Sequence, residues 1–133
     1  MARSNRCRAW LIALTGLIVP GTGWSDESVP VGYRTVATER GIPYTVLYAV
    51  ALTESAKKIR PPAVYRPWPW TLNIAGRGYF FDSRMAAWQA LTAWLGTGRR
   101  SVDIGLMQVN WRYHKKRLGT PWQALDPYHN LRV

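Results

Sequence analysis

The chain is poor in cysteine, in acidic residues and in long hydrophobic runs. Its 133 residues include one Cys and seven Asp or Glu, against 18 Lys or Arg. A single cysteine excludes a disulfide framework, a zinc finger and an iron–sulfur site built from this chain alone. The apolar run at residues 10–19 is shorter than the roughly 20 residues that a membrane-spanning helix needs. The length excludes a two-domain dehydrogenase or kinase, since one domain usually takes about 100–150 residues.

The sequence is, however, rich in apolar and aromatic side chains. It is 47% hydrophobic and contains eight Trp and seven Tyr. This apolar content argues against a disordered basic tail and favours one small globular domain. The formal charge of +11 suits an anionic partner, which can be nucleic acid, an anionic membrane surface or an acidic polymer.

The first 23 residues have the pattern of a secretory signal peptide. Arginines at positions 3, 6 and 8 precede the apolar run 10–19, and turn-forming residues 20–23 follow it. We therefore predict a signal peptide over residues 1–23 and an exported, periplasmic domain over residues 24–133; an ordinary buried N-terminal helix is the alternative. Cys7 lies inside the predicted signal. Export makes cell-envelope polymers the expected partner in place of nucleic acid, with membrane contact only through an uncleaved signal.

Apolar spacing and capping residues predict an α+β domain that is mostly α-helical. Helices are predicted at residues 31–40, 44–55, 84–95, 120–125 and from 126 to the end. The helix at 44–55 is apolar nearly all round, which predicts burial on most of its sides. Residues 70–74 and 79–81 are expected to form a small β-hairpin, and segments 59–69 and 99–110 to be irregular. The last helix is cut off at two turns, so we expect a C-terminally truncated domain.

The acidic residues are few enough to assign one by one. Asp26 and Glu27 lie near the predicted signal, Glu39 lies on an outer helix face, and Asp82 and Asp126 look like helix caps. That leaves two carboxylates as candidates for chemistry, Glu54 and Asp103.

Glu54 is the stronger candidate of the two. It ends the apolar helix, where burial would favour the protonated carboxyl that a general acid needs. The alternative is an ordinary ion pair with Lys57 or Lys58. Asp103 lies close to two arginines in the sequence, which favours a structural salt bridge.

A second candidate feature is the run Gly-Leu-Met-Gln-Val-Asn at residues 105–110. Gly105 allows a turn or the close approach of a ligand. Gln108 and Asn110 carry amides that suit sugar hydroxyls and N-acetyl groups. A turn with two surface amides is the alternative.

Together, Glu54-Ser55 and the 105–110 run closely resemble the lytic transglycosylases that carry a family-1 soluble-transglycosylase (SLT) domain. The resemblance covers about residues 31–133 and includes the segments 67–73 (PWPWTLN), 103–114 (DIGLMQVNWRYH) and 124–133 (ALDPYHNLRV). It is greatest for small, exported, lysozyme-like members that are associated with conjugation and specialised secretion systems.

The resemblance implies a lysozyme-like fold and a site that cleaves peptidoglycan glycan strands without a cofactor or metal. Glu54 would be the catalytic acid and base, with Ser55 beside it to orient the substrate or the glutamate. Gly105, Met107 and Gln108 would line the glycan groove, and Asn110 would support it. The family cleaves between N-acetylmuramic acid and N-acetylglucosamine and leaves a 1,6-anhydro end. Proteins of a conjugation or secretion apparatus would be further partners.

The residues themselves support this chemistry and leave alternatives open. Ordinary glycoside hydrolysis uses two carboxylates, and only Asp103 could be the second one here. Flat sugar faces stack on aromatic rings, for which Tyr65, Trp68, Trp70 and Trp111 are candidates, whereas Trp88 and Trp94 follow a helical stripe that indicates core. The alternatives are a non-catalytic peptidoglycan-binding scaffold, a lysozyme-type hydrolase and, with the signal peptide against it, a nucleic-acid binder.

Overall fold

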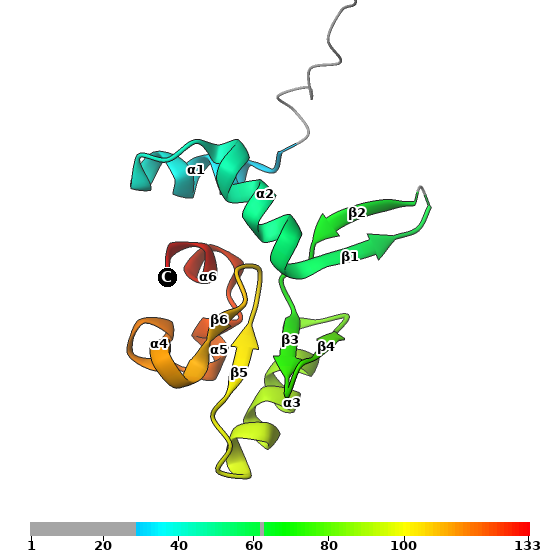
Figure 1. Ribbon diagram of the computed structural model, residues 1–133, viewed down its shortest axis with the longest axis vertical. Helices are drawn as coiled ribbons and strands as arrows, with labels where there is room; N and C mark the ends of the chain where they lie inside the picture. Colours follow the sequence, from blue (N-terminus) through cyan, green and yellow to red (C-terminus); the bar gives the residue numbers. More distant parts are fainter. Residues whose placement is uncertain (1–28, 62) are drawn as a thin grey trace, which may run out of the picture.

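The computed structural model describes residues 29–61 and 63–133, which form an α+β domain (Figure 1). About half of the described residues are helical and a fifth lie in strands. The α+β prediction is therefore confirmed at this level. The predicted signal peptide, with Cys7, lies outside the described residues.

Two helices that pack on each other begin the described chain: α1 (Val31–Arg40) and α2 (Tyr44–Ser55), both with the predicted bounds. Gly41 has φ 64° and ends α1 in the left-handed conformation that glycine adopts without strain. The rings of Tyr33 and Tyr48 join the two helices edge to face, with centroids 5.0 Å apart. Burial, reinforced by the nearby Tyr48, raises the pKa of Tyr33.

The predicted burial of α2 on most of its sides is wrong. Its buried residues are Leu47, Ala51 and Ser55, which lie at four-residue spacing and form one narrow stripe. Val46 and Val50, on another face, are 53% and 42% exposed. Because α1, the β1–β2 hairpin and the turn at Leu106 cover only part of α2, its apolar composition does not translate into burial.

The proline-rich segment after α2 is not a loop but a hairpin of β1 (Ala56–Ile59) and β2 (Val64–Pro67). The strands pair antiparallel from Ala56 with Pro67 to Ile59 with Val64. Proline is tolerated here because Pro61 lies in the turn and Pro67 ends a strand that has one neighbour only. The hairpin projects beside the C-terminal end of α2 (Figure 1).

A four-stranded antiparallel sheet forms the centre of the second half. Its strands are β3 (Thr71–Ile74), β4 (Arg77–Phe80), β5 (Val102–Ile104) and β6 (Val109–Asn110), in the order β4-β3-β5-β6. The predicted hairpin is confirmed as β3–β4. The prediction of irregular structure at 99–110 is wrong, because β5 pairs with β3, a partner that lies some thirty residues away in the sequence.

Four helices accompany this sheet: α3 (Arg84–Gly96), α4 (Trp111–Leu118), α5 (Pro121–Ala124) and α6 (Pro127–Arg132). Ser83 caps α3, Thr120 and Gln123 form a capping box on α5, and Asp126 caps α6. The sequence did not predict α4, which begins where Asn110 accepts a hydrogen bond from the N–H of Arg112.

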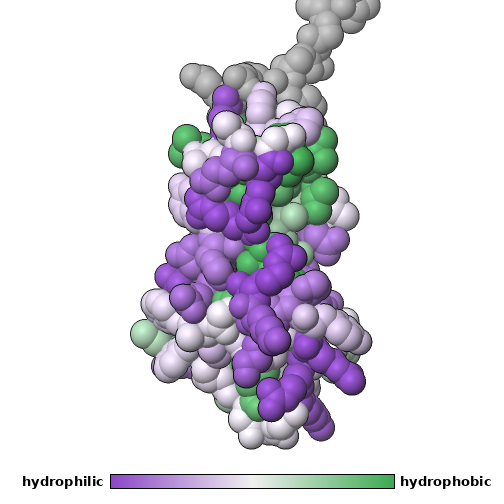
Figure 2. Space-filling view, turned by 90° about the vertical axis from the view of Figure 1, so that its left-hand side faces the viewer, coloured by the Kyte–Doolittle hydropathy of each residue, from purple (hydrophilic) through white to green (hydrophobic). Residues whose placement is uncertain are grey.

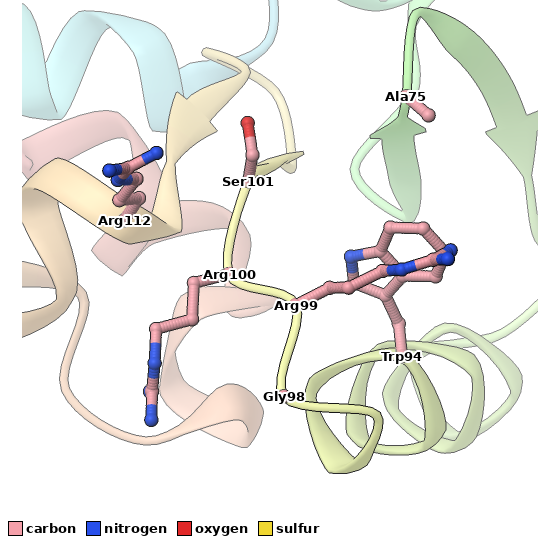
Figure 3. A pocket seen from close by; sticks show the side chains of 7 residues that line it. All are labelled: Ala75, Trp94, Gly98, Arg99, Arg100, Ser101 and Arg112. Carbon is pink, nitrogen blue, oxygen red and sulfur yellow. The ribbon is translucent and has the colours of Figure 1, made fainter.

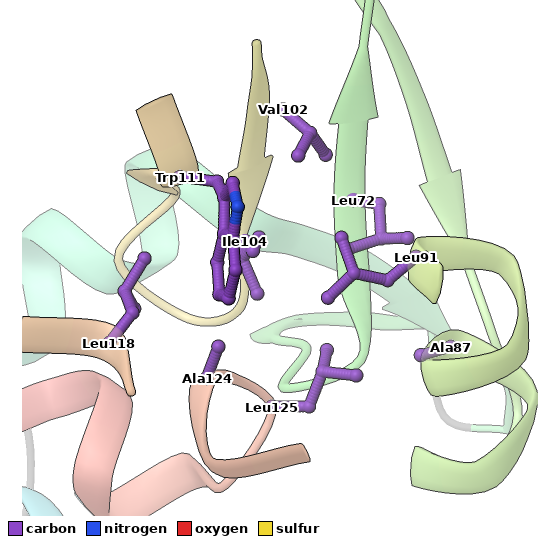
Figure 4. Packing of buried hydrophobic residues seen from close by; sticks show 9 residues of the cluster. All are labelled: Leu72, Ala87, Leu91, Val102, Ile104, Trp111, Leu118, Ala124 and Leu125. Atoms are coloured by element: carbon purple, nitrogen blue, oxygen red, sulfur yellow. The ribbon is translucent and has the colours of Figure 1, made fainter. Parts of the chain in front are cut away.

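The apolar side chains form two clusters. The larger lies between the sheet, α3, α4 and α5, and Figure 4 shows its buried members around the ring of Trp111: Leu72, Ala87, Leu91, Val102, Ile104, Leu118, Ala124 and Leu125. The smaller joins α1 and α2 to Leu106 and to Leu131 of α6. Each fully buried Leu, Ile or Val side chain contributes roughly 1.5–3 kcal/mol of transfer free energy to folding.

An ion pair fastens α6 to α1. Arg132 donates from Nε to Glu39 Oε2 at 2.7 Å and from Nη2 to Glu39 Oε1 at 2.8 Å, while Arg40 donates to the carbonyl oxygen of Arg132 at 2.6 Å. The hydrogen bond from Arg132 lowers the pKa of Glu39, and the charges of Arg132 and Arg40 act in the same direction.

We predict that the Glu39–Arg132 pair stabilises the fold at neutral pH and not in acid. Because the pKa of Glu39 is lower in the folded state than the unfolded value of 4.5, the stabilisation is complete above that value and is lost as the pH falls through the folded pKa. Urea unfolding measures the free energy of unfolding at about pH 7 and at about pH 3. The drop between the two should be smaller for Arg132→Gln than for the unaltered chain. An equal loss in both proteins would contradict the prediction.

The turn between β3 and β4 holds a residue in an unfavourable conformation. Ala75 has φ 53° and Gly76 has φ 81°, the positive values of a two-residue turn in which Asn-Gly is preferred. We predict that Ala75→Asn raises the free energy of unfolding by about 0.5–1 kcal/mol, whereas the β-branched Ala75→Val lowers it. Urea titrations measure both. A stabilising Val variant would show that the turn tolerates a branched side chain.

Candidate functional site

Ser55 connects the C-terminal end of α2 to the turn that follows β5. Its side chain is 1% exposed, and its Oγ lies 2.9 Å from the carbonyl oxygens of both Leu106 and Ala51. The single hydroxyl hydrogen can be donated to either. The backbone N–H of Trp68 also donates to the carbonyl oxygen of Ser55 at 2.9 Å. Ser55 therefore holds the helix end in place, a position that suits orienting its neighbour better than contacting a ligand.

Glu54 lies next to this anchor but points elsewhere, because successive residues of a helix differ by about 100° in direction. Its side chain is exposed, so the predicted burial is wrong. The alternative ion pair is not formed either: Lys57 lies 3.3 Å from Asp82 and 4.0 Å from the ring centroid of Trp68. Over residues 29–61 and 63–133, no hydrogen bond or ion pair engages the Glu54 carboxylate.

Every other carboxylate in the described ranges has a partner. Glu39 pairs with Arg132, Asp82 with Lys57, and Asp126 caps α6 and lies 3.5 Å from Arg84. Two predictions fail here. Ser83, not Asp82, caps α3, and Asp103 accepts a hydrogen bond from Asn110 at 2.7 Å in place of an arginine salt bridge.

The turn that begins at Gly105 is built around the buried amide of Asn130. Gly105 has φ 78°, and a Cβ atom added there would lie 2.6 Å from the Asn130 side chain. Asn130 is 1% exposed; it donates to the carbonyl oxygens of Ile104 and Ala124 and accepts from the N–H of Met107. Gly105 is thus required both by its conformation and by this close approach.

Gln108 and Asn110 use much of their polar capacity within the same segment. Gln108 has φ 47°, an unfavourable value outside glycine, and its Nε2 donates to the carbonyl oxygen of Gly105 at 2.8 Å. The same Nε2 lies 3.3 Å from the Thr71 carbonyl oxygen. Asn110 binds Asp103 and caps α4, and Met107 is half-buried against the α1–α2 cluster. Of this segment, Leu106 is the residue whose carbonyl oxygen contacts Ser55. Contacts of Gly105, Met107, Gln108 and Asn110 with a ligand stay predictions.

Sequence reasoning missed Asn130 as the residue that organises the site. Its three partners come from positions 104, 107 and 124, so no local pattern separates it from a surface amide.

The aromatic candidates divide into exposed and buried ones. Tyr65 on β2 is 60% exposed, and Trp68 and Trp70 are half-buried with ring centroids 5.7 Å apart. Trp111 is 3% exposed within the core, so its predicted role as a sugar-stacking ring is wrong. Trp88 and Trp94 pack against the core, as predicted, but each keeps an exposed part.

The positive charge is spread over the surface. Arg112, Lys115, Lys116 and Arg117 are exposed on α4. Figure 2 shows hydrophilic side chains gathered on the face that carries α4 and α6. A face of this kind attracts polyanions at low ionic strength and loses that attraction as salt screens it.

Comparisons of the chain with protein-family models, with curated proteins and with solved structures give no match. None of the described helices has the length and apolar character that crossing a membrane requires. Within the same residues, no group of three or more His, Cys, Asp or Glu is placed to hold a metal ion.

We predict that Gly105→Ala and Asn130→Ala each lower the free energy of unfolding by about 3 kcal/mol. The first strains the backbone and crowds Asn130, and the second leaves buried groups such as the Met107 N–H unpaired. Because removing the Asn130 side chain also removes the clash, the double variant should lose at least about 1 kcal/mol less than the sum. Urea unfolding measures all three.

The control is Gln89→Ala, an exposed amide on α3, which should change stability by less than about 0.5 kcal/mol. Strictly additive losses would show that Gly105 and Asn130 do not depend on each other.

Proposed function

We propose that the chain is an exported peptidoglycan lytic transglycosylase with a lysozyme-like arrangement, which opens the cell wall locally for a conjugation or secretion apparatus. The observation that carries the proposal is the state of Glu54. Among the described carboxylates it alone lacks a partner, and it lies next to Ser55, whose hydroxyl lies 2.9 Å from the Leu106 carbonyl oxygen of the Gly105–Asn110 segment.

The proposed reaction needs one carboxyl that acts twice. A glycan strand bound over Glu54 would exclude water from the carboxyl and favour its protonated form. Glu54 would then give its proton to the oxygen that joins N-acetylmuramic acid to N-acetylglucosamine, and the bond from muramoyl C1 to that oxygen would break. The carboxylate would next take the proton of the muramoyl C6 hydroxyl as its oxygen bonds to C1. The products are a free N-acetylglucosamine end and a 1,6-anhydro end, without water.

The engagement of the other carboxylates favours this route over hydrolysis. A hydrolase needs a second carboxylate to activate water or to attack the sugar. Asp103 is the candidate that the sequence leaves for this role, but it is half-buried and hydrogen-bonded to Asn110 at 2.7 Å. An internal hydroxyl nucleophile removes the need for that second group.

Aromatic rings beside the end of α2 supply surfaces for sugar rings. The Trp68 N–H hydrogen bond to Ser55 places Trp68 next to the helix end. Its indole Nε1 donates to the Phe81 carbonyl oxygen at 2.6 Å, and the ring meets Trp70 edge to face, so its orientation is fixed. Tyr65 presents a second, exposed ring on the projecting hairpin.

Glu54→Gln is expected to lower the release of anhydro-muropeptides from purified sacculi at least about 100-fold, the scale of a lost general acid and base. The amide keeps the size of the side chain, which is exposed, so the thermal midpoint should stay nearly unchanged. Mass spectrometry of the soluble products measures the effect.

Glu39→Gln is the matched control, because it makes the same chemical change at an exposed glutamate on α1. It also weakens the pair with Arg132, so activity is compared per amount of folded protein. Its activity should stay within about twofold of the unaltered protein. Reducing ends in place of anhydro ends would identify a lysozyme-type hydrolase. Binding to sacculi without soluble products, equal in both variants, would identify a scaffold and sink the proposed reaction.

A further inference from the structure

A cationic pocket lies at the end of the sheet away from α2. Its volume is about 690 Å³, and it is bounded by the β3–β4 turn, the end of α3, the segment before β5 and the start of α4 (Figure 3). The lining residues are Ala75, Trp94, Gly98, Arg99, Arg100, Ser101 and Arg112.

The positive charge of this pocket is not neutralised by the protein. Arg99, Arg100 and Arg112 are exposed, and no ion pair involves any of them within the described part of the chain. The nearest carboxylate along the chain, Asp103, is hydrogen-bonded to Asn110. Figure 3 shows the three side chains pointing in different directions, with Arg99 over Trp94 and Arg100 directed away from Arg112. Three guanidinium groups along one pocket without an acid nonetheless create a local field that favours an anion.

Trp94 adds a second feature to the pocket wall, one that Trp70 shares elsewhere in the core. Its indole Nε1 is buried and has no hydrogen-bond partner in the structure. Buried polar groups nearly always have a partner, so an unpaired donor in a pocket wall calls for an explanation. The Arg99 guanidinium lies 5.0 Å from the centroid of the same ring. In Figure 3 the indole nitrogen lies on the ring edge that faces the segment from Gly98 to Ser101.

We propose that this pocket binds a carboxylate of the peptide stems that peptidoglycan glycan strands carry, an inference that rests on the proposed function. A guanidinium group offers two parallel N–H donors to a planar carboxylate, and Arg99, Arg100 and Arg112 provide three such groups. The Ser101 hydroxyl adds a neutral donor. A carboxylate that pairs with Arg99 would lie near the Trp94 ring and so would alter the NMR signal of its indole N–H.

The position of the pocket suits a polymer that also reaches Glu54. At one end of β3, the Gly105 N–H donates to the carbonyl oxygen of Thr71 at 2.8 Å. At the other end, Ala75 follows the strand. At about 3.3 Å per residue, Thr71 and Ala75 lie roughly 13 Å apart. Because Ser55 contacts Leu106 of the same turn, a glycan strand that runs from Glu54 along the sheet would bring its peptide stems to the arginines.

Binding can be measured without cleavage by using an N-acetylmuramyl pentapeptide, which has no glycosidic bond to cut. The indole ¹⁵N–¹H signal of Trp94, assigned by its absence in Trp94→Phe, should shift saturably as the peptide with free carboxylates is added. The peptide with all carboxylates converted to amides should bind at least tenfold more weakly. The same loss is expected for the free-carboxylate peptide when Arg99→Gln and Arg112→Gln are combined.

Arg60→Gln is the matched control, because it removes the same charge from the exposed end of the β1–β2 hairpin. It should keep the affinity within twofold. No shift of the Trp94 signal, equal binding of the amidated peptide, or an equal loss with Arg60→Gln would each overturn the proposal. A shift with inorganic phosphate but not with the muramyl peptide would overturn it too and assign the pocket to phosphate.

The same experiment separates this inference from the proposed function. Glu54→Gln should bind the muramyl peptide as tightly as the unaltered protein, because it leaves the pocket intact. Peptide binding without cleavage of sacculi would remove the proposed reaction and keep the pocket. Cleavage without any shift of the Trp94 signal would do the reverse.

Discussion

The buried amide of Asn130 is the constraint on which the candidate site depends. One side chain joins α6 to the end of β5, to the turn at Met107 and to the end of α5. Its Nδ2 and Oδ1 both have partners, so the amide is satisfied although it is almost fully enclosed. The cost is steric, because nothing larger than glycine fits at position 105. The Gly-Leu-Met-Gln-Val-Asn run is therefore first a folding device, and its presence fixes the backbone around which a ligand site can form.

This device also explains why Glu54 is exposed. Leu106 lies in the turn that Asn130 holds, and its side chain packs into the α1–α2 cluster. Its carbonyl oxygen lies 2.9 Å from the Ser55 hydroxyl oxygen. The helix phase that turns Ser55 inward turns Glu54 outward, to solvent. The apolar helix thus ends with Ser55 committed to structure, while Glu54, the residue before it, has no partner within the described residues. That division leaves Glu54 as the candidate for chemistry, since every other side-chain carboxylate in the described residues is engaged.

The sequence predicted best what is decided locally. The helices at 31–40, 44–55 and 84–95 were found because Gly41, Pro43 and Ser83 mark their ends in the chain itself. The β3–β4 hairpin was found from the turn residues between its strands. Structure decided by distant partners was missed: β5 depends on β3, β1–β2 forms despite its prolines, and the Asn130 bonds span up to 26 residues. For the same reason Trp111, which reads as a surface aromatic, lies in the core.

The two candidate sites can coexist because their charges are kept apart. The Debye length is about 8 Å at physiological ionic strength, shorter than the roughly 13 Å of β3 that separates the Gly105 turn from the arginine pocket. On the proposed function the arginines would attract an anionic strand, and none of the ion pairs in the described residues joins them to Glu54. Asn110 contributes to this separation, since it occupies Asp103 with a neutral amide and leaves the arginines unpaired. An unpaired carboxylate near the end of α2 and unpaired guanidinium groups at the far end of the sheet would suit the proposed substrate, a neutral glycan with acidic branches.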